Sequence, residues 1–280
     1  MAGAMSPNPP HPRHQRARGA LHLAFKRRDG ATVLAGLRQE GCLRARFPRP
    51  GRGAWTGAVT LNVSGGITGG DVLATRITAG DGTACTVAGQ AAERFYRALP
   101  GTTPARVSAE ITVAPGAALE WLPQETILFD GCALDRVLRV DMAEDGWFLG
   151  VEQLVFGRAA MGEELREARL RDLIQVRRAG RLVLHDAVRL DGDAATCLDR
   201  PATGGGARAV ATVVYAAPDA AERLDPLRAA LDGHEFGASA WDGLLLARIV
   251  APHGAAQRAA TVAGLAALRA DRPLPRVWQC

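Results

Sequence analysis

Three segments of the chain place carboxylates beside glycines or apolar residues, the residue types from which ion-binding and acid–base sites are built. A carboxylate in an apolar run is costly to bury unless it is paired or solvated, so each segment is a candidate for chemistry. The segments are Leu61–Asp71 (L-N-V-S-G-G-I-T-G-G-D), Leu119–Gly131 (L-E-W-L-P-Q-E-T-I-L-F-D-G) and Phe156–Glu164 (F-G-R-A-A-M-G-E-E).

The first segment has two glycine pairs closed by Asp71. This pattern indicates a tight backbone turn that holds a carboxylate at its end. Phosphate binding is the competing interpretation, but the segment lacks the spacing and the Lys-Ser/Thr of a P-loop. Ser64 has no base near it in sequence, which disfavours a serine hydrolase. Taken alone, the segment is better explained as a close-packed turn.

The second segment places Glu120, Glu125 and Asp130 among large apolar residues. An acidic pocket or channel wall is one interpretation. Alternation along a half-exposed strand is the other, and locally it is favoured. In the third segment, Arg158 and Glu163 lie beside glycines, which indicates a loop that leads into a charged helix or strand.

Metal-ligand and nucleophile patterns are sparse. The six histidines form no H-E-x-x-H and no three-ligand cluster, so a tight metal site is not expected, whereas a weak site of carboxylates and waters stays open. Five widely spaced cysteines without a C-x-x-C indicate reduced thiols in the cytosol. Lys26 is the single lysine, which excludes a P-loop lysine and a Schiff-base lysine elsewhere in the chain.

The elements that would position these residues are mainly short strands. Seven Asp-Gly pairs supply turn residues between β-branched runs, and Val107, Ala109, Ile111 and Val113 alternate with polar residues. Strands are predicted at Val72–Thr78, Thr83–Ala88, Arg106–Val113, Ala118–Leu122, Leu134–Met142, Trp147–Phe156, Arg181–Asp186, Val210–Tyr215 and Leu244–Val250.

Two helices are predicted in the last quarter of the chain. Ala220–Leu231 has leucines at helical spacing after an Asp219…Glu222 capping pattern, and Gln257–Ala270 gathers its leucines on one face. Glu163–Val176 is ambiguous, because its Glu/Arg spacing favours a helix while its alternation allows a strand. The fold class is therefore mainly β with two C-terminal helices.

Charge is concentrated at the N-terminus. Residues 1–60 hold 11 basic and two acidic residues, whereas the rest holds 23 basic and 27 acidic residues. We expect residues 1–19 to be a disordered basic tail and residues 20–280 to be a single β-rich domain. The body has no basic stripe and no apolar run of membrane length, so neither nucleic acid nor a membrane is an expected partner, and a cytoplasmic location is expected.

Taken in order, the motifs resemble one family, the urease accessory proteins called UreD or UreH. Besides Leu61–Asp71 and Leu119–Gly131, the resemblance rests on Gln90–Arg97 (Q-A-A-E-R-F-Y-R), Gly157–Glu163 (G-R-A-A-M-G-E) and Pro275–Cys280 (P-R-V-W-Q-C). Ala88-Gly89 stands where the family usually has Thr-Thr. The motif residues singled out are Gly65, Gly66, Gly69, Gly70, Gln90, Tyr96, Pro123, Arg158 and Gly162.

The resemblance implies a maturation factor of nitrogen metabolism without catalysis of its own. It implies binding to apo-urease, docking of the helical partner UreF and the GTPase UreG, and passage of Ni(II) through a water-filled tunnel, with no tightly bound cofactor. It implies stacked sheets, layered or β-helix-like, with two helices. Under this resemblance Glu163–Val176 is expected to be mainly strand.

A nickel conduit must bind its cargo weakly enough to release it, which favours carboxylates and water over clustered thiolates or histidines. The predicted tunnel candidates are the carboxylates in or beside the family-like segments, and at most two or three of them are expected to matter. They are Asp71, Glu120, Glu125, Asp130, Glu152 and Glu163.

The UreF contact is expected on the C-terminal region, through Leu224, Leu227, Arg276 and Trp278. An exposed Trp278 would be a plausible interface anchor, and packing of Trp278 onto the body is the equal alternative.

Two other classes of function stay open. A scaffold for another metal assembly system would be expected to have cysteine-rich ligands, and a carbohydrate-active enzyme would need a carboxylate pair about 5–10 Å apart in an aromatic cleft.

Overall fold

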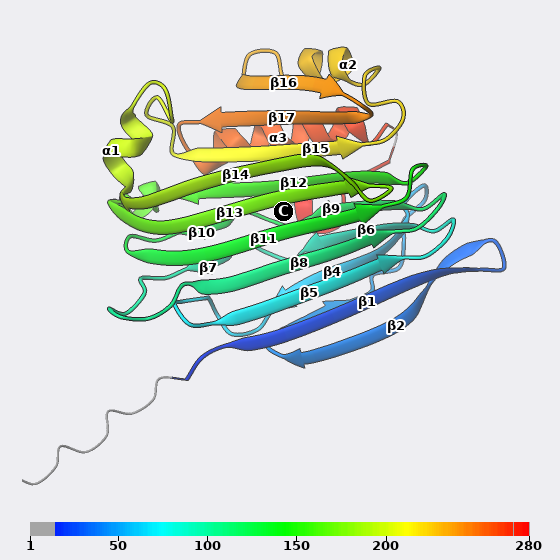
Figure 1. Cartoon of the computed structure of the whole chain (residues 1–280), viewed down its shortest axis with the longest axis horizontal. Coiled ribbons are helices and arrows are strands. Elements are labelled where there is room, and N and C mark those ends of the chain that lie inside the picture. The colour runs from blue at the N-terminus through cyan, green and yellow to red at the C-terminus, as the bar shows by residue number, and fades with distance from the viewer. Residues whose placement is uncertain (1–14, 271, 280) are drawn as a thin grey trace, which may run out of the picture.

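Two β-sheets lie face to face, and the two helices near the C-terminus lie on the outer side of one of them (Figure 1). The computed structural model describes residues 15–270 and 272–279. Most of the predicted tail, residues 1–14, lies outside the described residues. Its last two residues, Arg18 and Gly19, already belong to the first strand.

The first sheet has seven strands and the second has ten. The seven-stranded sheet has the order β14 (Arg181–Asp193), β13 (Glu167–Arg178), β11 (Cys132–Met142), β8 (Ala105–Val113), β5 (Val72–Ala79), β1 (Arg18–Arg28) and β2 (Ala31–Gly41). The ten-stranded sheet has the order β16 (Glu235–Trp241), β17 (Leu244–Ala251), β15 (Ala209–Ala216), β12 (Trp147–Phe156), β9 (Ala118–Leu122), β6 (Ala84–Gly89), β4 (Thr56–Asn62) and β3 (Leu43–Arg46), with β7 (Glu93–Phe95) and β10 (Thr126–Leu128) beside the end of β12.

In the middle of the molecule the chain winds from sheet to sheet. β5, β8 and β11 lie in the first sheet, and the strands that follow them, β6, β9 and β12, lie in the second. Neighbours within each of these sets are parallel. Successive turns of the chain therefore stack like a β-helix, which confirms the predicted mainly β architecture of stacked sheets.

Alternation along the strands fills the space between the sheets. In β11, Leu134, Leu138 and Val140 are buried in the inter-sheet core, whereas Arg139 and Asp141 are exposed. All nine predicted strand segments coincide with strands, and Thr83 alone lies just outside, before β6. The ambiguous Glu163–Val176 is a strand from Glu167 onward, because β13 is paired on both sides, with β11 and with β14, and this pairing outweighs helix propensity.

The strands of the first sixty residues were not predicted. In β1, Leu21, Leu23 and Phe25 alternate into the core, yet the basic residues around them hid this period-two pattern. β2 is exposed or half-buried along its whole length, so its sequence carries little alternation to detect.

Three helices are present among the described residues: α1 (Ala194–Asp199), α2 (Leu224–Ala230) and α3 (Gly254–Leu268), with short 3-10 turns at Ala159–Met161 and Arg276–Trp278. α3 packs on the outer face of β15 and β17 and against α2. This encloses a second core that includes Val151, Leu245 and Leu265. The two predicted helices are thus confirmed.

The predicted cap of the first of these helices is wrong. α2 begins after Arg223 and has no side-chain cap. The Asp219 carboxylate lies one turn earlier, where it accepts hydrogen bonds from the Tyr215 hydroxyl at 2.6 Å and from Arg223 Nε at 2.8 Å. A carboxylate with two such donors is not available to the helix N-terminus.

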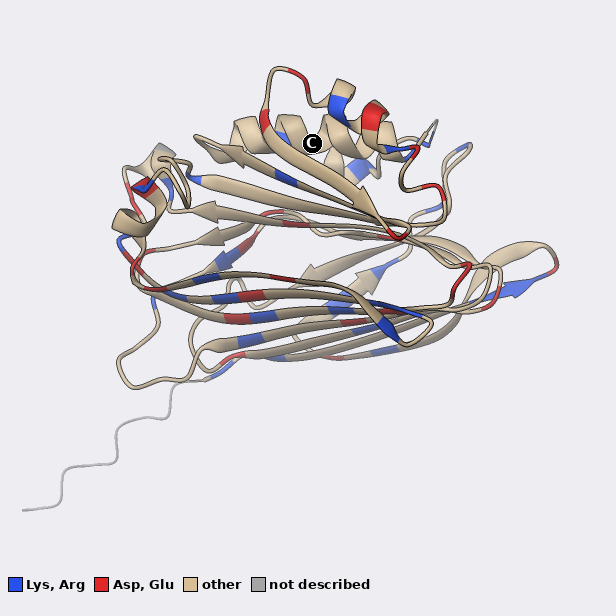
Figure 2. Cartoon of the chain, turned by 45° about the horizontal axis from the view of Figure 1, so that its top comes forward, with Lys and Arg blue, Asp and Glu red and all other residues tan. Residues whose placement is uncertain are grey.

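Within the described part of the chain, every helix is too short or too polar to cross a lipid bilayer. Along the strands of the seven-stranded sheet, basic and acidic residues lie close to one another, as Figure 2 shows.

Candidate functional site: a polar cavity between the sheets

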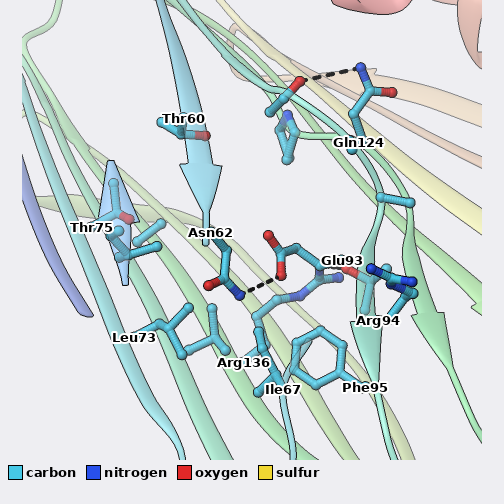
Figure 3. Close-up of a pocket in the computed structure, with 18 of the residues that line it drawn as sticks. Thr60, Asn62, Ile67, Leu73, Thr75, Glu93, Arg94, Phe95, Gln124 and Arg136 are labelled. Carbon is cyan, nitrogen blue, oxygen red and sulfur yellow. Dashed lines mark hydrogen bonds between the residues drawn. The ribbon is translucent and has the colours of Figure 1, made fainter. Parts of the chain in front are cut away.

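A cavity of about 300 Å³ lies between the two sheets, and polar side chains converge in it (Figure 3). Its apolar wall includes Ile67, Leu73 and Phe95. Gln90 and Arg94, which are exposed, lie at its opening to solvent. The interior of a two-sheet core is normally apolar, so the polar lining marks this cavity as the candidate site.

An ionic network crosses the inner end of the cavity. The buried Arg136 guanidinium donates to both Asp172 carboxylate oxygens, at 2.7 and 2.6 Å, and lies 2.8 Å from Glu152 Oε2. It also donates to the Thr126 hydroxyl at 2.7 Å. Trp121 Nε1 donates to the other Glu152 oxygen at 2.9 Å. Two carboxylates therefore share one guanidinium.

Strand register explains why these charges face inward. Arg136 on β11 is directly opposite Asp172 on β13, and both point into the inter-sheet space. The preceding pair in the same register, Asp135 and Arg171, points to solvent and forms its own ion pair at 2.8 Å. Successive residues of a strand face opposite sides of a sheet, so one pair is inside and the next is outside.

Burial dominates the titration of Glu152. It raises the pKa of this carboxyl, and the nearby Asp172 adds to the effect, while Arg136 and the Trp121 indole act against it. The Asp172 and Glu152 carboxylates raise the pKa of Arg136 despite its burial, so the guanidinium stays charged.

A second carboxylate, Glu93 on β7, lines the same cavity. Asn62 Nδ2 donates to it at 3.0 Å. Among the described residues Glu93 forms no ion pair, and burial raises its pKa, with the Asn62 hydrogen bond and the Arg94 charge acting against the shift. Figure 3 shows Glu93, Asn62 and Arg136 converging from different strands.

Of the six predicted tunnel residues, Glu152 alone lines this cavity. Glu93, Arg136 and Asp172 were not predicted from the sequence. Glu93 lies in the Q-A-A-E-R-F-Y-R motif, and the isolated carboxylate of that motif was the available signal.

Glu120 and Glu125 lie on the other side of the ten-stranded sheet. Glu120 is fully buried, and Arg269 Nε and Nη2 donate to its two oxygens at 2.8 and 2.9 Å, with Arg272 at 3.1 Å. Despite burial, these arginines and the Thr86 hydroxyl lower the pKa of Glu120. Glu125 pairs with Arg258 at 2.8 Å. Glu120 thereby holds the end of α3 and the segment that follows it to the sheet, and Glu125 holds α3 itself.

Asp71 closes the glycine-rich loop, as the sequence predicted. Its two oxygens accept from the backbone N–H groups of Ala17 and Thr68, each at 2.8 Å. In the same loop, Gly66 has a φ of 148° and lies against the Tyr96 ring, so a side chain at this position would collide with the ring.

Asp130 and Glu163 join loops at one end of the molecule. Asp130 Oδ1 accepts from the backbone N–H groups of Arg166 and Glu167, both at 2.9 Å, and Arg97 pairs with the other oxygen. These contacts lower the pKa of Asp130 against the effect of its own burial. Glu163 pairs with Arg158, whose guanidinium lies 4.2 Å from the Phe129 ring centre.

The remaining motif residues are structural in their surroundings. Gly65, Gly70 and Gly162 have positive φ, and a side chain on Gly69 would meet Thr102 and Ala98. The Pro123 carbonyl accepts from Gln153 Nε2 at 3.2 Å.

Of the two alternatives for Trp278, packing onto the body is confirmed and the exposed anchor is wrong, because the side chain is buried. Its indole Nε1 donates to the Leu122 carbonyl at 3.1 Å, and its ring packs into the second core beneath Arg258. Leu227 is also fully buried, against α3. Arg276 is exposed and Leu224 is half-buried.

Among residues 15–270 and 272–279, no group of three or more His, Cys, Asp or Glu side chains is arranged to hold a metal ion. The cavity instead offers separate carboxylates, Glu93 and Glu152, in a space large enough for water. Such an arrangement can contact a hydrated divalent cation without enclosing it.

Comparisons with known proteins agree along the whole described chain. A family model described as "UreD urease accessory protein" matches residues 17–279. A "Urease accessory protein UreD" of Methylobacterium sp. (strain 4-46) is 47% identical, over 98% of each chain. Proteins of the same name from Dinoroseobacter shibae and Rhizobium rhizogenes are 47% and 44% identical, over 96% and 95% of this chain and 94% and 96% of their own.

Proposed function

The chain belongs to the UreD family of urease accessory proteins, and from this premise we propose that it conveys Ni(II) to apo-urease through the cavity between its two sheets. A role in urease maturation follows from the family itself. Passage of nickel through the cavity is what we propose beyond that role.

The observation that carries the proposal is the pair of carboxylates, Glu93 and Glu152, on the wall of one inter-sheet cavity. Burying two acids costs free energy that leucine at the same positions would not, so a role other than stability accounts for them better. Nickel(II) is a borderline cation that accepts carboxylate and water oxygens. Carboxylates that already have a hydrogen-bond or ion-pair partner, as both of these do, bind it weakly, as passage requires.

We also propose that the protein acts as a non-catalytic adaptor between apo-urease, UreF and UreG. Nickel is then cargo rather than a cofactor, and any nucleotide hydrolysis belongs to UreG. On the C-terminal face, Arg276 and Leu224 remain candidates for the UreF contact because part of each side chain is accessible.

Co-expression of urease and its other accessory proteins, with and without this chain, tests the proposal. With the chain we expect urease that contains nickel and hydrolyses urea, and without it we expect little of either. Glu93→Gln and Glu152→Gln should each reduce activation severalfold. The matched control is Glu110→Gln, since the exposed Glu110 pairs with Arg76 on the outside of the seven-stranded sheet.

Pull-down of apo-urease by each variant separates docking from transfer. A Glu93 or Glu152 variant that docks normally but leaves urease nickel-poor supports the conduit. Full nickel loading by the Glu93→Gln/Glu152→Gln double variant would show that the metal takes another route.

A further inference from the structure

Arg136 holds a full positive charge at the inner end of a cavity that we assign to a cation. This is unexpected, because a fixed guanidinium repels Ni(II). We propose that Arg136 is a built-in counter-cation that occupies the position between Glu152 and Asp172 and so keeps these carboxylates from retaining the metal. The inference rests on the proposed function, since it explains how carboxylates in the cavity release Ni(II) after contact.

The hydrogen bonds leave no carboxylate oxygen of this pair without a donor. Both Asp172 oxygens accept from Arg136. One Glu152 oxygen lies 2.8 Å from Arg136, and the other accepts from the Trp121 indole. Nickel can therefore bind these oxygens only if the guanidinium moves away, and the adjoining cavity of about 300 Å³ gives it room to do so.

The chemistry of arginine suits this task. Its planar fork matches a carboxylate with two parallel hydrogen bonds, and it does not lose its proton in proteins. Asp172, Glu152 and Arg136 carry a net charge of −1 when all three are ionised. Without the arginine, two buried carboxylates would face each other, and a divalent cation would be their natural partner.

We predict that removing the charge of Arg136 makes the protein retain nickel instead of passing it on. Purified full-length Arg136→Met protein, dialysed against nickel sulfate, should retain about one nickel per chain, with a Kd at least about tenfold lower than that of the wild type. Nickel should also raise the melting temperature of this variant more than that of the wild type. In co-expression, the variant should activate urease less while still docking to it.

Two controls isolate the buried charge. Arg171→Met removes the exposed arginine of the neighbouring pair on the same two strands, and it should leave nickel retention unchanged. Arg136→Met/Asp172→Asn removes one of the two carboxylates as well, and it should lose the retained nickel.

A buried arginine cannot always be replaced without unfolding, so further variants keep the test decisive. Arg136→Gln keeps a hydrogen-bond donor without the charge and should also retain nickel. Arg136→Lys keeps a cation in place and should behave like the wild type. Folded Arg136→Met or Arg136→Gln protein that binds no more nickel than the wild type overturns the inference.

The two levels of the proposal fail differently. If urease is activated equally well without this chain, the proposed function fails, and nickel retention by the variants still decides the role of Arg136. If activation requires the chain but Arg136→Met neither retains nickel nor lowers activation, only the counter-cation inference fails.

Discussion

Two buried arginines of this protein each hold a carboxylate through two nitrogens. Arg136 grips Asp172 with two nitrogens, and Arg269 grips Glu120 in the same way. A lysine ammonium is a point charge and cannot form this double contact. The 33 arginines and one lysine of the chain are therefore consistent with a molecule that pairs its buried carboxylates through forked contacts.

Glu93 should make the protein less stable as the pH rises. Burial raises its folded-state pKa above the ordinary value near 4.5, so the folded state binds its proton more tightly than the unfolded state does. The destabilisation is absent below the unfolded pKa, grows between the two pKa values and is complete above the folded one. Glu93→Gln should therefore melt at a higher temperature than the wild type near pH 7, by roughly 2–4 °C per kcal/mol regained.

Thermal melts of both proteins from pH 4 to pH 8 provide the measurement. The difference in melting temperature should be smallest at pH 4 and should increase upward. Glu110→Gln serves as the control, since Glu110 is exposed. A constant difference across this range would contradict the assigned cause. A gain in stability together with a loss of activation would mark Glu93 as a functional residue.

At the residue level, the sequence pointed to Glu152 as a candidate but not to its partners in the structure. Period-two alternation tells which residues of one strand share a face, but not which strand lies opposite. Arg136 and Asp172 are 36 positions apart and meet only because β11 and β13 pair in register. Glu120 was misplaced for the same reason: it neighbours Trp121 in sequence but points to the other side of the sheet.

Among the elements, the C-terminal segment after α3 stands out because side-chain contacts hold it. Arg269 and Arg272 reach Glu120 on β9, and Gln124 Nε2 donates to the Val277 carbonyl at 2.8 Å. The Trp278 indole completes the attachment. The segment is thus part of the second core rather than a loose tail.

Trp278→Ala should destabilise the protein substantially. The change removes a buried ring and leaves the Leu122 carbonyl without its indole donor, at a cost of about 3–5 kcal/mol. A fall in melting temperature of roughly 10 °C is expected in calorimetry. Trp241→Ala is the matched control, because Trp241 on β16 is 40% exposed, and it should cost much less. Equal falls would contradict the buried role of Trp278.

Prediction of the elements succeeded where hydrophobic alternation was strong. The nine predicted strands lie mostly in the parallel coils, where Val, Ile and Leu dominate the inner face. The short β7 and β10 were missed because three residues are too few to show a period. Their positions follow from their pairing with each other and with β12, which sequence alone does not show.

At the scale of the whole molecule, winding the chain between two sheets leaves open edge strands. Among the described residues, β2 and β14 bound one sheet, and β16, β3 and the short β7 bound the other. β2 is the most exposed of these, with Leu34 and Leu37 partly open to solvent at 37% and 42%. Open edges with apolar residues favour strand addition by another chain.

Leu37→Lys should therefore lower the tendency of the isolated protein to self-associate, because a charge on an edge strand opposes pairing. The melting temperature should change by only about 1–2 °C, since the side chain is already partly exposed. Light scattering across a range of protein concentrations measures the effect. Leu23→Lys, which buries a charge in the core of β1, should instead unfold the protein. Unchanged scattering by a well-folded Leu37→Lys protein would show that the protein does not self-associate through β2.

The paired register of β11 and β13 has one more consequence. Asp135–Arg171 and Arg136–Asp172 join the same residue types across the same two strands, one at the surface and one buried between the sheets. Added salt screens the outer pair, whereas the buried pair is screened much less. The molecule thus contains an exposed and a buried Asp–Arg pair at adjacent positions of one strand pairing, the buried one with Glu152 and Thr126 as additional partners. The electrical environment of the cavity can be gauged against that internal reference, without recourse to any second protein.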